Sequence, residues 1–116
     1  MTRLAIVGSR EFPDEQQVRA FVHALRADTI IVSGGARGVD RWAEDQARKD
    51  GLQVEVFLPD YKTEPKWLAP KLRNTEIAKS ADQMVAFWDG TSTGTRDAIN
   101  KMLDLGKPVN VIVKRK

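Results

Sequence analysis

The stretch Ile30–Asp40 reads Ile30-Ile31-Val32-Ser33-Gly34-Gly35-Ala36-Arg37-Gly38-Val39-Asp40. Its β-branched run breaks at a serine and two glycines, and Gly38 then opens an amphipathic segment. This order predicts a strand, a loop of bare backbone and the start of a helix. Such a loop presents backbone N–H groups at the positive end of a helix dipole, where an anion can bind. We therefore expect the loop to form half of a site for a phosphorylated small molecule.

The composition narrows the classes of protein to which the chain can belong. Its 116 residues suit one domain, and we treat 1–116 as a single domain. The absence of cysteine excludes a disulfide framework, a zinc–thiolate site and a cysteine nucleophile. The single histidine, His23, disfavours a histidine-based metal cluster. We therefore expect no metal and no cofactor.

The charge balance and the N-terminal sequence indicate whether the chain is expected to bind nucleic acid or a membrane. The chain has 19 basic and 16 acidic residues, so its net charge is +3. This mild excess gives little support for nucleic-acid binding, which needs a basic face. The apolar run Leu4–Val7 is too short for a signal peptide or a membrane span. We therefore expect a cytoplasmic protein that does not act on a membrane.

Five short apolar segments are typical of strands, and each is followed by a break in the pattern. They are Leu4–Val7, Thr29–Ser33, Val54–Leu58, Met84–Phe87 and Pro108–Val113. Between them, apolar residues recur at helical spacing and predict four helices. Asp14 is the expected N-cap of the first helix, and Gly51 is expected just after the second.

This alternation of strands and helices decides the fold class. Crossovers that contain a helix indicate an α/β fold, in which helices cover both faces of a parallel sheet. Right-handed crossovers leave few topologies. We predict a Rossmann-like three-layer sandwich with a five-stranded parallel sheet in the order 3-2-1-4-5. In that order the chain reverses direction between strands 1 and 4.

Glycine, serine and threonine concentrate where strands 1, 2 and 4 end. Ligands of open α/β sheets bind outside the carboxyl ends of the strands, at the point where the strand order reverses. The candidate ligand-binding residues at these ends are Gly8, Ser9, Arg10, Ser33, Gly34, Gly35, Arg37, Gly38, Asp40, Trp88, Asp89, Ser92, Thr93, Gly94 and Thr95. The alternative is that the glycines only form tight turns and the hydroxyl residues only cap helices. Three such loops at one sheet edge favour a site.

The side chains in these loops suggest distinct roles. Arg10 and Arg37 offer forked guanidinium donors that suit phosphate or carboxylate. The hydroxyl and backbone groups around Thr93 can donate to a phosphate at the start of the last helix. Asp40 can cap its helix, hold an arginine or accept a hydrogen bond from a ribose hydroxyl, and Asp89 is open to the last two roles.

No standard phosphate-binding motif is complete. Gly34–Gly38 lacks the spacing of Gly-x-Gly-x-x-Gly and the lysine of a P-loop. This disfavours ordinary ATP hydrolysis and dinucleotide-dependent dehydrogenation.

The three tryptophans differ in their expected roles. Trp42 lies on the apolar stripe of its helix, so we expect it in the core. Trp88 either stacks on a base or walls the cleft. Trp67 lies in the irregular segment Tyr61–Pro70 and is a candidate lid or oligomer contact.

Several blocks together resemble a known family. They are Val7-Gly8-Ser9-Arg10, Ser33-Gly34-Gly35-Ala36-Arg37-Gly38-Val39-Asp40, Arg73-Asn74, Asp89-Gly90 and Gly94-Thr95-Arg96-Asp97. Their order is similar to that of the YspA-like, YpsA-related branch of the SLOG superfamily. That superfamily includes the Lonely Guy phosphoribohydrolases, often described as lysine decarboxylase-like, and the DNA-processing protein DprA. The resemblance covers nearly the whole chain.

The resemblance implies a Rossmann-like fold with a pocket for nucleotides or nucleotide-derived ligands. It implies that Gly94 and Thr95 hold a phosphate, and it adds Arg73 and Asn74 to the site. Lonely Guy enzymes carry Pro-Gly-Gly-x-Gly-Thr-x-x-Glu, whereas Ala98 stands here at the glutamate position. Asp97 lies one residue earlier, about 100° around a helix. Asp97 and Arg73 are therefore the candidate catalytic residues.

Three functions remain open at this point. The favoured one is a module that binds or senses a nucleotide-like small molecule. The alternative is a nucleoside 5′-monophosphate phosphoribohydrolase, and single-stranded DNA binding comes third. The sequence does not decide whether the chain is an enzyme. The resemblance also makes a homo-oligomer plausible.

Overall fold

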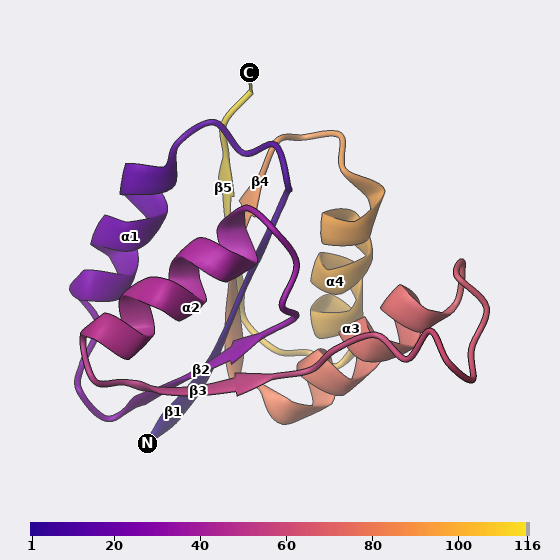
Figure 1. Cartoon of the computed structure of the whole chain (residues 1–116), viewed down its shortest axis with the longest axis horizontal. Coiled ribbons are helices and arrows are strands. Elements are labelled where there is room, and N and C mark those ends of the chain that lie inside the picture. The colour runs from indigo at the N-terminus through magenta and orange to yellow at the C-terminus, as the bar shows by residue number, and fades with distance from the viewer. Residues whose placement is uncertain (116) are drawn as a thin grey trace.

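The computed structural model describes residues 1–115, in which strands and helices alternate along the chain (Figure 1). The strands are β1 (Thr2–Gly8), β2 (Thr29–Ser33), β3 (Gln53–Val56), β4 (Gln83–Trp88) and β5 (Val109–Val113). The helices are α1 (Glu15–His23), α2 (Val39–Lys49), α3 (Ala69–Ser80) and α4 (Thr93–Asp104).

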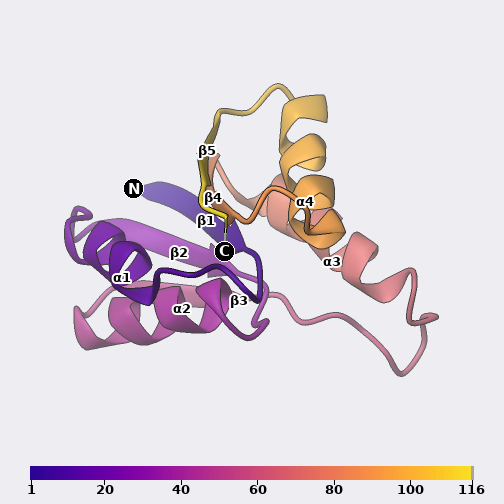
Figure 2. The same ribbon diagram turned by 90° about the horizontal axis from the view of Figure 1, so that it is seen from above.

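The sheet confirms the predicted topology. Its strands are parallel and lie in the order β3-β2-β1-β4-β5, with β1 at the centre. Helices α1 and α2 cover one face, and α3 and α4 cover the other (Figure 2). The carboxyl ends of β1, β2 and β4 therefore meet at one edge, at the point where the strand order reverses. Among the described helices, none is both long enough and apolar enough to cross a membrane.

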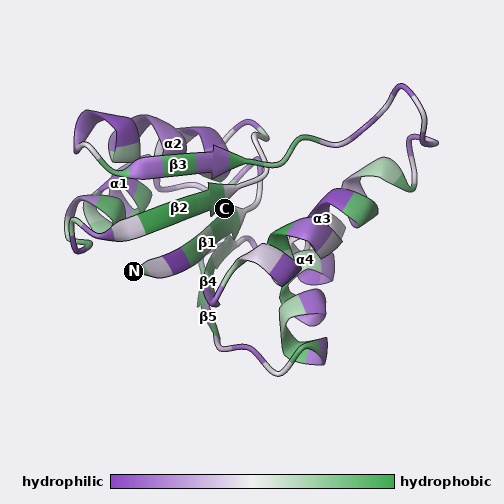
Figure 3. Ribbon diagram, turned by 90° about the horizontal axis from the view of Figure 1, so that it is seen from below, coloured by the Kyte–Doolittle hydropathy of each residue, from purple (hydrophilic) through white to green (hydrophobic). Residues whose placement is uncertain are grey.

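Two hydrophobic clusters, one on each face, hold the three layers together. Side chains alternate along β1, so that Leu4 and Ile6 face the cluster under α1 and α2, while Ala5 and Val7 face the cluster under α3 and α4. On the first face, the rings of Phe12 and Phe87 meet edge to face at 5.5 Å. Figure 3 shows β2 and most of β1 as hydrophobic, whereas the helices carry both hydrophilic and hydrophobic residues. Burial on both faces explains why these strands read as continuous apolar runs.

Several element ends differ from the sequence prediction by one or two residues; β1, for example, begins at Thr2 and not at Leu4. The carboxylate of Asp14 accepts a hydrogen bond from the N–H of Gln17 at 3.0 Å, which confirms the predicted N-cap. Helix α1 ends at His23, earlier than its apolar stripe suggested. Strand β3 ends at Val56 because its partner β2 stops at Ser33, which leaves no backbone for Leu58 to pair with.

The connection from β3 to α3 is the longest irregular segment of the described chain, and it projects from the body of the molecule (Figure 2). The carboxylate of Asp60 stabilises its turn by accepting hydrogen bonds from the N–H groups of Lys62 and Thr63. The predicted core residue Trp42 is partly buried against the cluster under α1 and α2, whereas Trp67 is exposed on the projecting segment.

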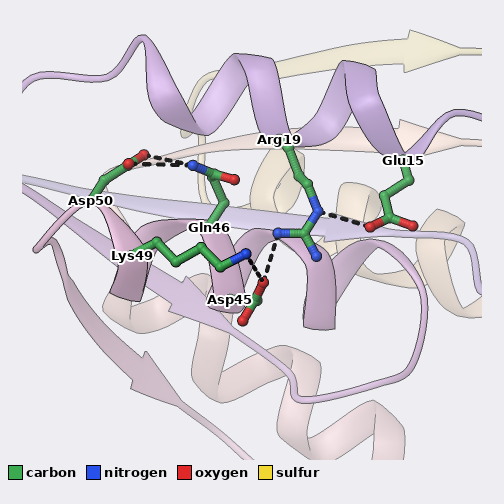
Figure 4. A network of polar contacts seen from close by, with 6 residues as sticks. All are labelled: Glu15, Arg19, Asp45, Gln46, Lys49 and Asp50. Atoms are coloured by element: carbon green, nitrogen blue, oxygen red, sulfur yellow. Dashed lines mark hydrogen bonds and ion pairs between the residues drawn. The ribbon is translucent and has the colours of Figure 1, made fainter.

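A network of polar side chains links the outer surfaces of α1 and α2 (Figure 4). Arg19 donates to Glu15 at 2.8 Å and to Asp45 at 2.7 Å. Lys49 pairs with the same Asp45 at 3.3 Å. These residues do not line the site described below, so this network supplies control positions for experiments.

Candidate ligand-binding site

A cavity of about 420 Å³ lies at the edge where β1, β2 and β4 end. This volume is within the range of small-molecule sites. It brings together most of the residues predicted from the sequence. The predicted residues that line it are Gly8, Ser9, Arg10, Gly34, Arg37, Asp40, Arg73, Asn74, Ser92, Thr93, Gly94 and Thr95.

The loop after β2 lies directly against the loop after β1. Gly38 has a φ of +81°, a backbone conformation that residues with a side chain rarely adopt. A Cβ at Gly38 would lie only 2.7 Å from the main-chain oxygen of Arg10. Gly38 does not line the cavity; its role is to bring Arg37 and Asp40 to the same wall as Arg10.

Arg73 extends from α3 to the loop after β2. Its Nη1 donates to the main-chain oxygen of Gly34, and its Nε donates to Asn74 Oδ1 at 2.9 Å. A Cβ at Gly34 would lie 2.7 Å from Arg73 Nη1, so the missing side chain makes this approach possible. Burial lowers the pKa of the Arg73 guanidinium, and the negative charge of Asp40 opposes that shift.

Asp40 places a carboxyl group in the wall of the cavity. Its side chain is buried, with 5% relative exposure for the residue. Oδ2 accepts a hydrogen bond from the N–H of Ala36 at 3.2 Å, whereas Oδ1 has no hydrogen-bond partner among the described residues. Burial raises the pKa of Asp40 to about 7, although the Ala36 N–H and the charge of Arg73 both oppose the rise. The N–H of Gly34 also lowers the pKa of Asp40, but Oδ1 makes no hydrogen bond of normal geometry, so the site holds a buried carboxyl oxygen whose hydrogen bonding is incomplete.

Ser33 lies behind this wall and not on it. Its buried hydroxyl donates to Glu44 Oε2 at 2.6 Å, and neither residue lines the cavity. Glu44 is itself buried on α2 one turn after Asp40, and its charge helps to raise the pKa of Asp40. Ser33 therefore supports the site from beneath.

The loop after β4 is organised by Asp89. Its Oδ1 accepts from the N–H groups of Thr91 and Ser92, at 2.9 and 2.8 Å, and its Oδ2 accepts from the Ser92 hydroxyl. Burial opposes ionisation, but these hydrogen bonds prevail and hold the pKa of Asp89 below its usual range. Asp89 does not line the cavity, so its observed role is to shape the loop.

Trp88 makes its contacts within the loop after β4. Its Nε1 donates to the main-chain oxygen of Ser92 at 3.0 Å, and the Arg96 guanidinium lies 5.7 Å from the centre of its ring. Trp88 is partly buried and is not among the residues that line the cavity. It therefore braces the loop after β4.

Helix α4 presents its N-terminus to the cavity. Its N-cap residue, Ser92, makes no side-chain capping bond, so the first N–H groups of the helix have no partner within it. A Cβ at Gly94 would meet nothing within 4 Å, which leaves the approach to these groups open. Ser9 fixes the position of this helix, because its hydroxyl accepts from the N–H of Asp89 at 3.0 Å and lies 3.4 Å from Thr95 Oγ1.

Asp97, the predicted catalytic acid, lies outside the cavity lining. Its Oδ2 accepts from Asn74 Nδ2 at 3.0 Å and pairs with Lys101 Nζ at 2.8 Å. Asp97 therefore orients Asn74, while the Asp that lines the cavity is Asp40.

Some lining residues were not predicted from the sequence. They are Val7, Glu11, Ala36, Pro70, Ile77 and Ala98. Glu11 and Ala36 directly follow predicted positions in the loops after β1 and β2, so their place in the sequence could have suggested them. Pro70 and Ile77 come from α3, where the sequence carried no signal of cavity contact.

A second cavity of about 370 Å³ adjoins the first. The two share Arg10, Gly34, Ala36, Pro70 and Arg73. Gly35, a predicted site residue, lines only the second cavity, together with Leu58, Pro59 and Tyr61.

We compared the sequence and the fold with those of known proteins. Residues 2–63 match the model of the YspA, cpYpsA-related SLOG family. DNA processing protein A (DprA) from Streptococcus pneumoniae superposes with a TM-score of 0.81 at 20% identity, over 98% of this chain and 51% of that one. The chain thus spans about half the length of DprA. The structure of TM1055 superposes with a TM-score of 0.71 at 23% identity, over 94% of this chain and 72% of that one. At these identities both likenesses show the fold alone. No curated protein matches.

Proposed function

We propose that this chain, which belongs to the YspA, cpYpsA-related SLOG family, binds a nucleotide or a nucleotide-derived phosphorylated ligand in the cavity at the ends of β1, β2 and β4. The proposal rests on two complementary features of one cavity, a positively polarised helix N-terminus and a buried carboxyl group. One wall offers an uncapped helix N-terminus, and another holds the buried Oδ1 of Asp40, whose hydrogen bonding is incomplete. A ligand with an anionic end and a hydroxyl donor would satisfy both.

The anionic end of the ligand would bind at the start of α4. The N–H groups there carry the positive end of the helix dipole, and the open space at Gly94 allows a phosphate to approach the backbone. Arg10, Arg37 and Arg73 line the same cavity and add positive charge. Among the described residues, Glu11 and Asp40 are the acidic groups that line it.

The hydroxyl end of the ligand would bind at Asp40. A buried carboxyl oxygen whose hydrogen bonding is incomplete destabilises the folded protein unless water or a ligand supplies the missing bond. A ribose hydroxyl is a donor of suitable size, and its hydrogen bond would favour the ionised carboxylate. Because one part of the cavity suits an anion and another suits a hydroxyl group, the cavity favours a sugar phosphate over a simple inorganic anion.

Binding can be measured directly. Isothermal titration calorimetry would compare AMP, GMP, ADP-ribose and inorganic phosphate on the wild-type chain, on Asp40→Asn and on Arg19→Ala. We expect one or more nucleotides to bind the wild type and Arg19→Ala equally and Asp40→Asn more weakly. If no nucleotide gives a heat of binding and none raises the melting temperature of the chain, the proposal is wrong.

A second candidate, hydrolysis of the N-glycosidic bond of a nucleoside 5′-monophosphate, is favoured by one observation. Asp40 lines the cavity, and its pKa of about 7 suits a general acid near neutral pH. A glycosidic cleavage needs such a carboxyl group near the sugar. Release of free base from AMP would be followed by chromatography in Asp40→Asn and Asp97→Ala. Loss of release in Asp40→Asn with residual release in Asp97→Ala would support it, and no release by the wild type would exclude it for AMP.

A further inference from the structure

The second cavity differs in chemistry from the first. The walls that it does not share come from Gly35, Leu58, Pro59 and Tyr61. Its polar side chains at the junction with the main cavity are Arg10 and Arg73. The second cavity is therefore a more apolar chamber that shares Arg73 with the first cavity, whereas the start of α4 lines only the first.

Two large side chains that line the second cavity are exposed to solvent. Leu58 is 70% exposed and Tyr61 is 53% exposed. Leu58 lies close against Gly35, because a Cβ at Gly35 would be only 2.6 Å from Leu58 Cδ2. This contact places an apolar wall beside the loop after β2.

Arg73 joins the two compartments. Its guanidinium is held by the main-chain oxygen of Gly34 and by Asn74 Oδ1, so its position is defined. A planar guanidinium can donate at its edge and stack at its face. A flat ring in the apolar chamber could therefore lie against Arg73 on one side and against Leu58 or Tyr61 on the other.

We infer that the chamber of Gly35, Leu58, Pro59 and Tyr61 is a subsite for the planar base of a nucleotide whose phosphate lies at the start of α4. The inference rests on the proposed function and deepens it, because it distinguishes a nucleotide from a sugar phosphate. The ligand would extend past Arg73, with its base outside the main cavity. Stacking depends little on which base is bound, so the chamber would favour ligands that carry a base without discriminating strongly between different bases.

The test compares AMP with ribose 5-phosphate, which lacks the base, by isothermal titration calorimetry. The variants are Leu58→Ala and Tyr61→Ala. Trp67→Ala is the matched control, because Trp67 is 68% exposed on the same segment and lines neither cavity. Since all three side chains are exposed, urea unfolding is expected to show little change in stability.

We expect Leu58→Ala and Tyr61→Ala to weaken AMP binding by about tenfold, as the loss of one stacking surface would. Ribose 5-phosphate should bind both variants as it binds the wild type, and Trp67→Ala should leave both ligands unaffected. Unchanged AMP affinity in both variants would overturn the inference while leaving the proposed function intact, and so would equal losses for AMP and ribose 5-phosphate. If the wild type binds neither compound, the proposed function fails, and the inference fails with it.

Discussion

Arg73 Nη1, on α3, donates a hydrogen bond to the main-chain oxygen of Gly34, which lies thirty-nine positions earlier in the loop after β2. The contact ties one wall of the cavity to another across the sheet edge. It exists because Gly34 carries no side chain: a Cβ there would approach both Arg73 Nη1 and Asp40 Oδ2 within 3.0 Å.

Gly34→Ala should therefore disturb the site and the fold together. The added methyl group must displace the Arg73 guanidinium or the backbone, and overpacking of this kind costs about 1–3 kcal/mol. Urea unfolding would measure the loss of stability, and calorimetry with AMP would measure the loss of binding. A Gly34→Ala chain that unfolds and binds like the wild type would contradict this account of the Arg73 contact.

Gly94→Ala should have the opposite effect on stability. Its Cβ would meet no protein atom, and alanine favours the helical conformation by up to about 1 kcal/mol. The same methyl group would occupy the approach to the first N–H groups of α4, so AMP binding should weaken by about tenfold. Asn100→Ala, on the exposed surface of the same helix, serves as the control. Unweakened binding in Gly94→Ala would place the phosphate elsewhere.

Asp40→Asn should change how stability depends on pH. The pKa of Asp40 rises from its ordinary value of 3.8 to about 7 in the folded chain, chiefly through burial. Between these values the folded chain keeps a proton that the unfolded chain has lost, so stability falls as pH rises through this window. An asparagine cannot ionise, so the variant should lack this fall. Urea unfolding between about pH 4 and about pH 8 would measure both slopes, and equal slopes would contradict the assignment.

Asp89→Ala should loosen the loop after β4. The carboxylate accepts hydrogen bonds from the N–H groups of Thr91 and Ser92 within the loop, and the loss of such bonds costs about 0.5–1.5 kcal/mol each. AMP should bind more weakly because the start of α4 is less well ordered, although Asp89 does not line the cavity. Arg19→Ala, which breaks the surface network of α1 and α2, should cost less than about 1 kcal/mol and leave binding unchanged. Equal losses of binding in the two variants would contradict the proposed role of Asp89.

The architecture could be predicted from the sequence because its signals are periodic. Strands buried on both faces read as apolar runs, and helix stripes between them fix the alternation that gives the strand order. The same reasoning placed the loops at one sheet edge, which is why the sequence could put Ser9, Arg37 and Thr95 near the cavity that they line. Arg73 and Asn74 could not be found this way, because spacing alone does not show which face of α3 turns toward the cavity.

The roles of individual loop residues were harder to predict. Asp89 and Trp88 follow a strand directly, as ligand-binding residues often do, yet their side chains bond to their own loop. Such short-range hydrogen bonds depend on backbone geometry that composition does not encode. Leu58 was expected to be paired in a strand, but the end of β2 leaves it free to line the second cavity.

The central position of β1 also has a consequence for how the chain folds. Leu4 pairs with Ile31 on one side and with Gln83 on the other, so the strand made first acquires its second neighbour only after most of the chain exists. Closing a loop of that length slows folding, because its entropy must be lost before the new contacts form. Until β4 arrives, the β1 edge of a β1–β2–β3 intermediate would remain open to pairing with other chains. In such a state, the unpaired edge of β1 would be the part of the sheet most able to pair with another chain.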